Sequence, residues 1–278
     1  MNVNGKRILV TGGTSGVGLA LTGALTAAGA RVVTCGRRAD RSGAGLGSFT
    51  ADLAVAGEAT RVVDLAAGFL GGLDVVVANA GVQHLIDLTR GPDLEVLALA
   101  EQELAVNLRS VVELAAASWP HLTGPAAGSA GTAGTAGSAG DPGRSGSARR
   151  GAARGGGPGR ETAFVAVTSG LAYAPKKSAP VYCATKAAVH TLLRSLRYRA
   201  EDETPWLRVQ EVVLPLVDTP MTAGREGAAR KIPPAAAARA VVRGLERGRP
   251  VIAVGVSRTL LALLRVHPGT AYRILRNS

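Results

Sequence analysis

The sequence predicts an α/β protein in which a doubly wound parallel sheet lies between two layers of helices, a three-layer α/β/α arrangement. Short runs rich in Val and Ile alternate with Ala- and Leu-rich segments through most of the chain, which is the pattern of consecutive βαβ units. The Val/Ile runs are apolar on both faces, as buried parallel strands are. A chain of 278 residues fits one such domain, whereas two domains of ordinary size would be tight.

Six segments are predicted to be strands, and four longer segments between them are predicted to be helices. The predicted strands are Arg7–Thr11, Arg31–Cys35, Asp74–Ala78, Ala163–Thr168, Arg208–Val213 and Pro250–Val254. The predicted helices are Val17–Ala28, Thr60–Phe69, Leu97–Ser118 and Val181–Ala200. Right-handed crossovers in such a sheet place ligands at the carboxyl ends of the strands, so functional residues are expected there.

The composition excludes several classes of protein. Hydrophobic residues make up 46% of the chain, which excludes global disorder. Only two cysteines are present, Cys35 and Cys183, which excludes a disulfide-stapled secreted scaffold and indicates a reducing compartment. The first ten residues carry no signal-peptide pattern, and no apolar run approaches the roughly 18 residues that span a bilayer. We therefore expect a soluble cytoplasmic protein without a transmembrane segment.

The net charge of +12 would by itself suggest an anionic partner. Several of the arginines, however, fall in or beside one low-complexity segment: Arg144, Arg149, Arg150, Arg154 and Arg160. Aromatic residues, on which the bases of single-stranded nucleic acids stack, make up only 3% of the chain. The four histidines show no metal-ligand spacing. We expect neither a nucleic-acid partner nor a bound metal.

One segment, Gly124–Gly159, departs from the alternating pattern because it consists mostly of Gly, Ala, Ser and Thr. Such a composition cannot bury enough apolar surface to offset the entropy of ordering the chain. The segment is predicted to be a flexible insertion between a helix ending near Pro120 and a strand starting near Ala163. A helix-to-strand connection lies at the amino ends of the strands, opposite the ligand crevice, so no catalytic role is expected for it.

A glycine-rich turn, Thr11–Gly18 (TGGTSGVG), follows the first predicted strand and opens the first predicted helix. Glycines there permit a tight turn and a close approach of backbone to a pyrophosphate, and the free N–H groups at the helix start attract phosphate. The spacing of Gly12, Gly16 and Gly18 differs from G-x-G-x-x-G, and no Gly-Lys-Ser/Thr follows as in a Walker loop. Its position between strand and helix predicts a dinucleotide-binding site.

Two arginines, Arg37 and Arg38, stand at the end of the second predicted strand. A site that prefers NAD carries Asp or Glu at this place, for the ribose hydroxyls. Guanidinium groups suit a 2′-phosphate instead. The sequence therefore favours NADP(H) as the cofactor, with NAD(H) possible.

A tyrosine and a lysine, Tyr182 and Lys186, lie one helical turn apart at the start of a predicted helix. The i, i+4 spacing puts the phenol and the ammonium on one helix face, where the positive charge favours the phenolate. This lowers the pKa of the phenol from its ordinary value of about 10, so that it can act as a general acid and base. Ser169 stands at the end of the predicted strand that begins at Ala163, where its hydroxyl could donate to the same substrate oxygen.

Together with the glycine turn, these residues resemble the short-chain dehydrogenase/reductase family of the Tyr-x-x-x-Lys type. The matching pieces cover nearly the whole chain outside the Gly/Ala-rich segment: Thr11–Gly18, Asn79–Gly81, Asn107, Ser169, Tyr182–Lys186 and Val217–Pro220. The C-terminal part, with Ile232–Pro234 and Val254–Arg265, resembles the DltE-type oxidoreductases of that family. The resemblance implies a single NAD(P)-binding Rossmann-like domain over residues 1–278.

The resemblance also implies a role for each matching residue. Tyr182 is the proton donor and acceptor, Ser169 orients the substrate carbonyl, and Lys186 tunes Tyr182 and binds the nicotinamide ribose. Asn107 holds a water molecule in the proton relay. The implied cofactor-binding residues are Thr11, Gly12, Thr14, Ser15, Gly16, Val17 and Gly18 in the turn, Arg37 and Arg38, Asp52 and Leu53 at the adenine, Asn79, Ala80 and Gly81 on the adenosine side, Val217 and Thr219 at the carboxamide, and Tyr182 and Lys186.

The chain departs from the family pattern at two further places. The stretch from Arg37 to Ser48 leaves little room for the family's second crossover helix, because a parallel crossover usually needs a dozen or more residues. In the family, a Pro-Gly pair usually follows the strand that corresponds to Arg208–Val213; here that pair is Pro215-Leu216. Leu260–Leu264, flanked by Arg258 and Arg265, is expected to lie in a C-terminal helix that covers the substrate crevice or makes a subunit contact, and an interfacial membrane helix is the alternative.

The activity that the resemblance implies is an NADPH-dependent oxidoreductase acting on a carbonyl or secondary alcohol substrate, with Tyr182 as general acid and base. Two alternatives stay open: a non-catalytic NADP(H)-binding regulatory protein, and a dehydratase or epimerase on the same fold. The residues do not identify the substrate or the direction of the reaction. A homodimer or homotetramer is common in the family and is expected here.

Overall fold

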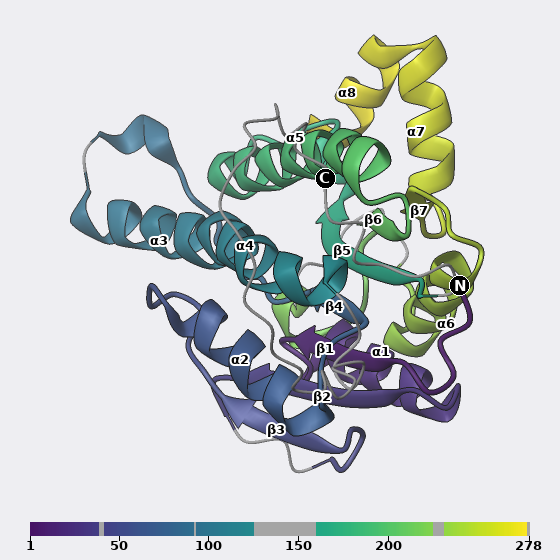
Figure 1. Ribbon diagram of the computed structural model, residues 1–278. Coiled ribbons are helices and arrows are strands. Elements are labelled where there is room, and N and C mark those ends of the chain that lie inside the picture. The colour runs from purple at the N-terminus through teal and green to yellow at the C-terminus, as the bar shows by residue number, and fades with distance from the viewer. Residues whose placement is uncertain (39–41, 92, 125–159, 225–230, 277–278) are drawn as a thin grey trace, which may run out of the picture.

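The computed structural model describes residues 1–38, 42–91, 93–124, 160–224 and 231–276, and it contains one seven-stranded sheet (Figure 1). The strands are β1 (Arg7–Thr11), β2 (Arg31–Gly36), β3 (Gly47–Thr50), β4 (Val75–Ala78), β5 (Thr162–Ser169), β6 (Leu207–Leu214) and β7 (Val251–Ala253). All are paired in parallel, in the order β3-β2-β1-β4-β5-β6-β7. The strand order reverses between β1 and β4, which confirms the predicted doubly wound sheet.

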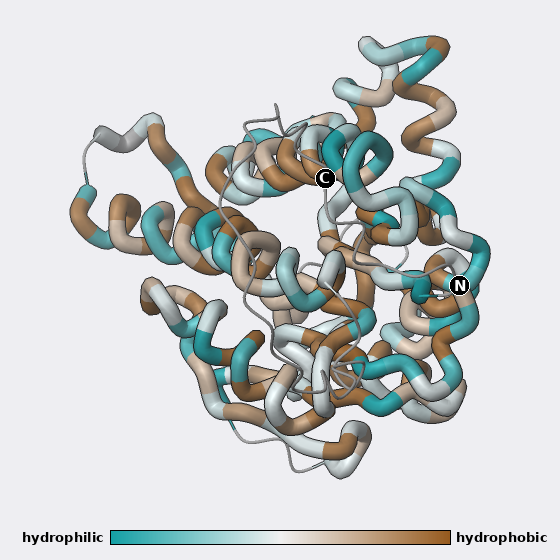
Figure 2. The backbone as a smooth tube through the Cα atoms, in the orientation of Figure 1, coloured by the Kyte–Doolittle hydropathy of each residue, from teal (hydrophilic) through white to brown (hydrophobic). Residues whose placement is uncertain are grey.

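Helices cover both faces of the sheet. The described residues form α1 (Gly16–Ala27), α2 (Glu58–Leu70), α3 (Leu94–Leu104), α4 (Ser110–Thr123), α5 (Pro180–Glu203), α6 (Pro234–Glu246), α7 (Ser257–Val266) and α8 (Pro268–Arg276), of which five cover the sheet. α1 and α6 pack on one face around Val10, Leu21 and Leu245. α2, α4 and α5 pack on the other face, around Phe164 and Leu193. The core is therefore split into two layers by the sheet, whose central strands β1 and β4 are mostly hydrophobic (Figure 2).

The six predicted strands are all present, but the sequence analysis missed β3. This strand lies at the edge of the sheet and is only half-buried, so its sequence, Gly-Ser-Phe-Thr, carries no apolar run. β3 pairs in parallel with β2, and the described residues between them form no helix. The described residues of the short connection after Arg37 therefore include no crossover helix.

The long helix predicted over Leu97–Ser118 begins earlier and is interrupted. α3 starts at Leu94, where the Asp93 side chain accepts a hydrogen bond from the backbone N–H of Glu95 and caps the helix. A π-helical turn at Ala105–Arg109 then separates α3 from α4. Such turns insert an extra residue into the hydrogen-bond ladder and occur frequently at functional sites.

The predicted insertion, residues 124–159, lies outside the described residues except for Gly124. The flanking residues meet at the amino end of the sheet, because the Arg160 guanidinium donates hydrogen bonds to the backbone carbonyls of Leu73, His121 and Gly124. Arg160 lies two residues before Thr162, the first residue of β5. The two ends of the segment therefore lie at the opposite end of β5 from Ser169.

Among the described residues, no helix has the length and apolar character needed to cross a membrane.

Candidate active site

The glycine turn is packed against the end of β4 so closely that side chains would not fit. A Cβ atom on Gly18 would lie 2.1 Å from the carbonyl oxygen of Gly12, and one on Gly12 would lie 2.9 Å from Cα of Ala80. Gly12 and Gly16 also have positive φ angles of 65° and 53°, which L side chains rarely adopt. The turn therefore requires glycine at the positions that the sequence analysis singled out.

Hydrogen bonds from β4 fix the shape of this turn. The Asn79 side chain donates through Nδ2 to the carbonyl oxygen of Thr11 (2.9 Å), and the Thr11 hydroxyl accepts from the backbone N–H groups of Asn79 and Ala80. Ser15, at the N-cap of α1, makes no side-chain capping bond. The N–H groups that open α1 therefore remain available for an anion, as a phosphate cradle requires.

The loop after β6 lies beside the same turn. A Cβ on Gly16 would lie 3.3 Å from Cγ2 of Thr219. Thr222 shapes this loop, because its hydroxyl donates to the carbonyl oxygen of Val217 (2.6 Å) and accepts from the backbone N–H of Thr219 (3.1 Å). Val217 and Thr219, predicted to contact the cofactor, are thus brought next to the predicted phosphate site.

Tyr182 and Lys186 occupy the first turns of α5 on one face of the helix. Pro180 stands at the first position of α5, where its missing N–H costs no hydrogen bond. The Tyr182 side chain is buried, and Nζ of Lys186 lies 5.7 Å from the centre of its ring. Ser169 ends β5, and its Oγ accepts from the backbone N–H of Leu171 (3.2 Å). The structure therefore places the phenol and the ammonium together, beside the strand that ends at Ser169.

Lys186 is a buried cation, and its surroundings act on its charge. Its Nζ donates to the carbonyl oxygen of Val167, 2.9 Å away. Burial lowers the pKa of Lys186 to about 8, while the negative charge of the buried Glu103 opposes this fall. At neutral pH the ammonium is still protonated, but it can lose its proton in mildly alkaline solution.

Asn107 lies in the π-helical turn and is fully buried. Its Oδ1 accepts from the backbone N–H of Val82 (2.9 Å), and its Nδ2 donates to the carbonyl oxygen of Val82 (2.8 Å). A Cβ on Gly81 would lie 3.1 Å from Oδ1 of Asn107 and 3.5 Å from Nζ of Lys186. The segment after β4, the π-helical turn and α5 therefore meet at one point.

The residues predicted at the adenine side lie at the ends of β2 and β3. Arg37 and Arg38 are exposed at a bend directly after β2. Asp52 and Leu53 follow β3, with the Asp52 side chain exposed and the Leu53 side chain buried in the core. A Cβ on Gly36 would lie only 2.5 Å from Oγ1 of Thr14, so the end of β2 lies against the glycine turn. All of these positions share the carboxyl edge of the sheet.

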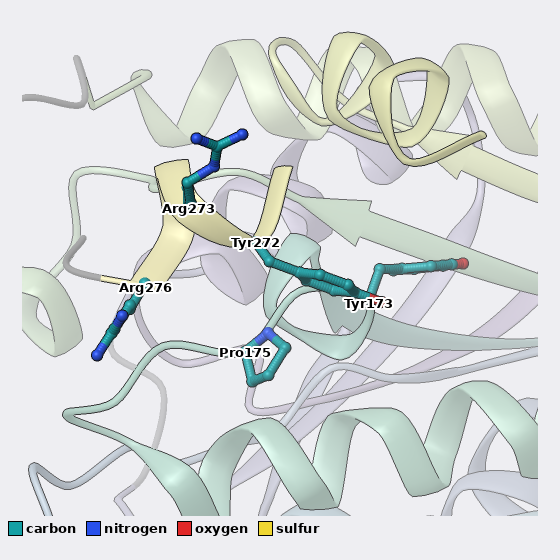
Figure 3. A pocket seen from close by; sticks show the side chains of 5 residues that line it. All are labelled: Tyr173, Pro175, Tyr272, Arg273 and Arg276. Carbon is teal, nitrogen blue, oxygen red and sulfur yellow. The ribbon is translucent and has the colours of Figure 1, made fainter. Parts of the chain in front are cut away.

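A groove of about 490 Å³ lies between α8 and the loop that connects β5 to α5 (Figure 3). It is lined by Tyr173, Pro175, Tyr272, Arg273 and Arg276. α7 packs over the start of the same loop, where a Cβ on Gly170 would lie 2.7 Å from Cδ2 of Leu260. The expected C-terminal helix thus covers the chain directly after Ser169.

The sequence analysis missed a buried polar cluster centred on Glu211 in β6. Its carboxylate accepts hydrogen bonds from Thr168, Tyr173 and His190, none of which was singled out as a functional residue. The available signal was one charged residue inside the otherwise apolar end of the strand sequence LRVQEVVL. Within the described ranges, no group of His, Cys, Asp and Glu side chains has the arrangement of a metal site.

Comparisons with known proteins agree with this geometry. The family model described as short chain dehydrogenase matches residues 6–145 and 158–229. The chain is 30% identical over 225 residues to the uncharacterized oxidoreductase DltE of Bacillus subtilis, covering 79% of this chain and 74% of that protein. It is 31% identical over 228 residues to L-xylulose reductase of Bos taurus, covering 80% and 75%.

Solved structures show the same fold. A short chain dehydrogenase from Burkholderia cenocepacia in complex with NADP superposes with a TM-score of 0.74 at 21% identity, over 99% of both chains. The ligand-free aldohexose dehydrogenase of Thermoplasma acidophilum has a TM-score of 0.68 at 17% identity, over 91% of this chain and 92% of that one. The match of the family model, and the coverage of the relatives, show that the chain belongs to the short chain dehydrogenase family of oxidoreductases.

Proposed function

We propose that the protein is an NADPH-dependent oxidoreductase that interconverts a carbonyl compound and the corresponding alcohol, with Tyr182 as the general acid and base. The observation that carries this proposal is the buried pair of Tyr182 and Lys186. It lies on the helix that follows Ser169 and contacts the segment directly after β4. A phenol held beside a buried ammonium in this way is suited to proton transfer.

The described residues fit a nicotinamide dinucleotide. The Gly12–Gly18 backbone forms a cradle that side chains would fill, and the start of α1 is uncapped, as a pyrophosphate requires. Gly81 and Lys186 would face the ribose next to the nicotinamide, and Thr219 would lie at its carboxamide. When bound, the nicotinamide supplies or accepts the hydride.

The protein's own residues move and stabilise the proton. In reduction, the Tyr182 hydroxyl gives its proton to the substrate oxygen as the carbonyl carbon gains hydride, and the Ser169 hydroxyl donates a hydrogen bond to the same oxygen. The phenolate left on Tyr182 is stabilised by the Lys186 ammonium. Oxidation uses the same groups in reverse, with phenolate taking the proton from the alcohol.

NADPH is proposed over NADH because of Arg37 and Arg38. Both side chains are exposed at the bend after β2, on the edge of the sheet that carries the glycine turn. A guanidinium there can pair bidentately with a 2′-phosphate, whereas the ribose hydroxyl of NADH gains little from it.

We also propose that the protein assembles into a homodimer or homotetramer in the cytoplasm. The supporting feature is an apolar groove of about 360 Å³ between α4 and α5, lined in part by Trp119, Leu192 and Leu196. Sedimentation of the purified protein tests this assembly, and a monomer at micromolar concentration would contradict it.

The central test is a panel of ketones and aldehydes with NADPH, followed by the loss of cofactor absorbance. Tyr182→Phe should lower kcat by about a thousandfold or more while the Kd for NADPH changes by less than about threefold, because only the hydroxyl is removed. Tyr198→Phe is the matched control, since Tyr198 is exposed further along α5 and should have no effect. Turnover retained by Tyr182→Phe would rule out the assignment.

A further inference from the structure

A carboxylate that the proposed chemistry does not use is buried in the carboxyl-terminal half of β6. Glu211 lies in β6 with 1% of its surface exposed, and its neighbours on the same face of the strand are Val209 and Val213. Burial alone would raise its pKa, but hydrogen bonds from His190 and Thr168 and the positive charge that His190 can carry hold that pKa below its ordinary value. Glu211 is therefore ionised at neutral pH.

Three donors from three segments satisfy this carboxylate. The Thr168 hydroxyl donates to Oε1 at 2.6 Å, and the Tyr173 hydroxyl donates to Oε2 at 2.9 Å. Nδ1 of His190 lies 2.8 Å from Oε2, and since an ionised carboxylate can only accept, that nitrogen carries the hydrogen. The Tyr173 and His190 rings also contact each other, with their centres 4.5 Å apart.

The three donors flank the groups that do the chemistry. Thr168 directly precedes Ser169 in β5, and Tyr173 lies four residues after it, so Glu211 holds the strand end on both sides of Ser169. His190 lies one helical turn beyond Lys186 and two beyond Tyr182 on α5. One carboxylate thus connects the segment that carries Ser169 to the helix that carries the phenol and the ammonium.

A wholly apolar cluster of similar volume would serve the core at this position at least as well. A buried ionised group must lose its hydration, and replacing buried charges by well-packed apolar residues of similar volume is often neutral or stabilising. The face of the sheet around Glu211 is otherwise built from apolar side chains that pack against α5. Stability therefore does not explain the carboxylate, whereas a requirement for fixed geometry does.

We infer that Glu211 is a positioning residue for the reaction: it fixes the distance between the Ser169 hydroxyl and the Tyr182 phenol by holding Thr168, Tyr173 and His190 at once. This inference rests on the proposed function of Tyr182. Glu211 itself touches no reacting atom. Through Tyr173 it also fixes one wall of the groove beneath α8, on which Tyr272 and Arg273 lie (Figure 3).

The first test measures kinetics and stability together. Glu211→Leu should lower kcat per folded molecule by about tenfold to a hundredfold, as expected when hydrogen bonds to a charged group are lost, while the Kd for NADPH stays unchanged. The melting temperature should fall, because Thr168, Tyr173 and His190 lose their acceptor, so kcat is taken per folded molecule. Gln210→Leu is the matched control. Gln210 is the neighbouring buried residue of β6, points to the other face and donates to the carbonyl oxygen of Arg249, so its loss should leave kcat unchanged.

The donors can be removed one at a time. Thr168→Val, which keeps the shape of the side chain, should lower kcat by about tenfold with KM unchanged, and it should have no further effect in the Glu211→Leu background. Tyr173→Phe should raise KM more than it lowers kcat, because its ring forms the groove wall. Full additivity of Thr168→Val and Glu211→Leu, or a fall in melting temperature in place of kcat, would overturn the inference.

A second measurement does not depend on turnover. Hydrogen exchange of the backbone amides of residues 170–174, measured by mass spectrometry, should become at least about tenfold faster in Glu211→Leu and stay unchanged in Gln210→Leu. Unchanged exchange in both variants would overturn the inference, whatever substrate the enzyme takes. If neither the native protein nor Tyr182→Phe reduces any carbonyl compound, the proposed function is wrong. The exchange result then still tests whether Glu211 holds residues 170–174 in place.

Discussion

The two ends of the sheet each hold a buried carboxylate, but the two are bound by different partners. Asp74, directly before β4, accepts from the backbone N–H and the guanidinium of Arg7, and pairs with the guanidinium of Arg160 at 3.5 Å. Glu211, toward the other end, is held by two hydroxyls and an imidazole. Asp74 ties the beginnings of β1, β4 and β5 together, whereas Glu211 ties together segments that carry reacting groups.

We infer from this difference that the two ends of the sheet have different roles. The amino end of the sheet uses strong charge pairs between strand starts, which stabilise the fold and contact nothing in the proposed active site. The carboxyl end keeps buried groups whose burial costs free energy, among them Lys186 and Glu211. Substitutions at the two ends should therefore separate stability from activity.

The largest expected effect is that of Lys186→Met. It should lower kcat by about a thousandfold, because the phenolate on Tyr182 loses its cation. It should also raise the free energy of unfolding by up to about 3 kcal/mol, the equivalent of a fall in the pKa of a lysine from 10.5 to about 8. Chemical denaturation and steady-state kinetics on one preparation test both effects, and a less stable variant would contradict the inference that burying Lys186 costs free energy.

The same lysine predicts a pH dependence. Between pH 8 and 10.5 the unfolded chain keeps a proton on Lys186 that the folded chain has lost, so the stability rises with pH in this range. In Lys186→Met this rise should be absent. The melting temperatures of the native protein and of Lys186→Met are measured between pH 8 and 10.5, and the two curves should diverge. Parallel curves would show that the pKa of Lys186 is not lowered.

Next in size is the effect of Asp74→Ala at the opposite end. It should destabilise the fold by about 3–5 kcal/mol, since it leaves the guanidinium of Arg7 buried without its partner, while kcat per folded molecule stays unchanged. Burial alone would raise the pKa of Asp74, but the hydrogen bonds from Arg7 together with its positive charge outweigh burial and hold that pKa below its ordinary value. This contribution is therefore present at neutral pH and lost as the pH falls below about 4.

The control for Asp74→Ala is Glu161→Gln. Glu161 pairs with Arg208 near the same end, but both side chains are more than a third exposed, so its loss should cost less than about 1 kcal/mol. A loss of kcat in folded Asp74→Ala would show that the two ends are coupled.

A smaller effect is expected from replacing both Arg37 and Arg38 by Ser. The two residues lie at the carboxyl end of β2, so the change should act on the cofactor and leave stability unaltered. We expect kcat/KM for NADPH to fall by about tenfold to a hundredfold with little change for NADH, as when charge-assisted hydrogen bonds to a phosphate are removed. Equal losses with both cofactors would refute the proposed preference.

The smallest effect is expected when residues 125–159 are replaced by a short Gly/Ser linker. Gly124 and Arg160 already contact each other, so the ends can be joined without moving β5. Stability should change by less than about 1 kcal/mol, and kcat should not change. A folded deletion variant with greatly reduced turnover would show that the amino end of the sheet does take part in the chemistry.

Much of this molecule could be predicted from local sequence. The central strands are runs of Val and Ile because they are covered on both faces, and the glycine turn is recognisable because its close contacts with Ala80 and Asn79 tolerate no side chain. β3 was missed because an edge strand needs no apolar run. The π-helical turn at Asn107 was missed because an extra residue in a helix leaves the hydrophobic pattern almost unchanged.

The Glu211 cluster could not be predicted, because its members are far apart in the sequence and unremarkable one by one. The sequence indicates only that Thr168 is a strand residue and that Tyr173 belongs to a loop. It indicates that His190 is a helix residue without the spacing of a metal ligand. Only the pairing of β5 with β6, and the packing of α5 on both, brings them within hydrogen-bond distance of one carboxylate.

Because Gly124 and Arg160 contact each other, another protein or a linker can be inserted into the chain at this point. A fluorescent protein, an affinity handle or a surface linker inserted there would project from the end of β5 that faces away from Tyr182. The two halves of the chain on either side of that point each supply part of one continuous sheet. The two halves could therefore be fused to two other proteins as complementary fragments, and their reassembly would show that those two proteins bind each other.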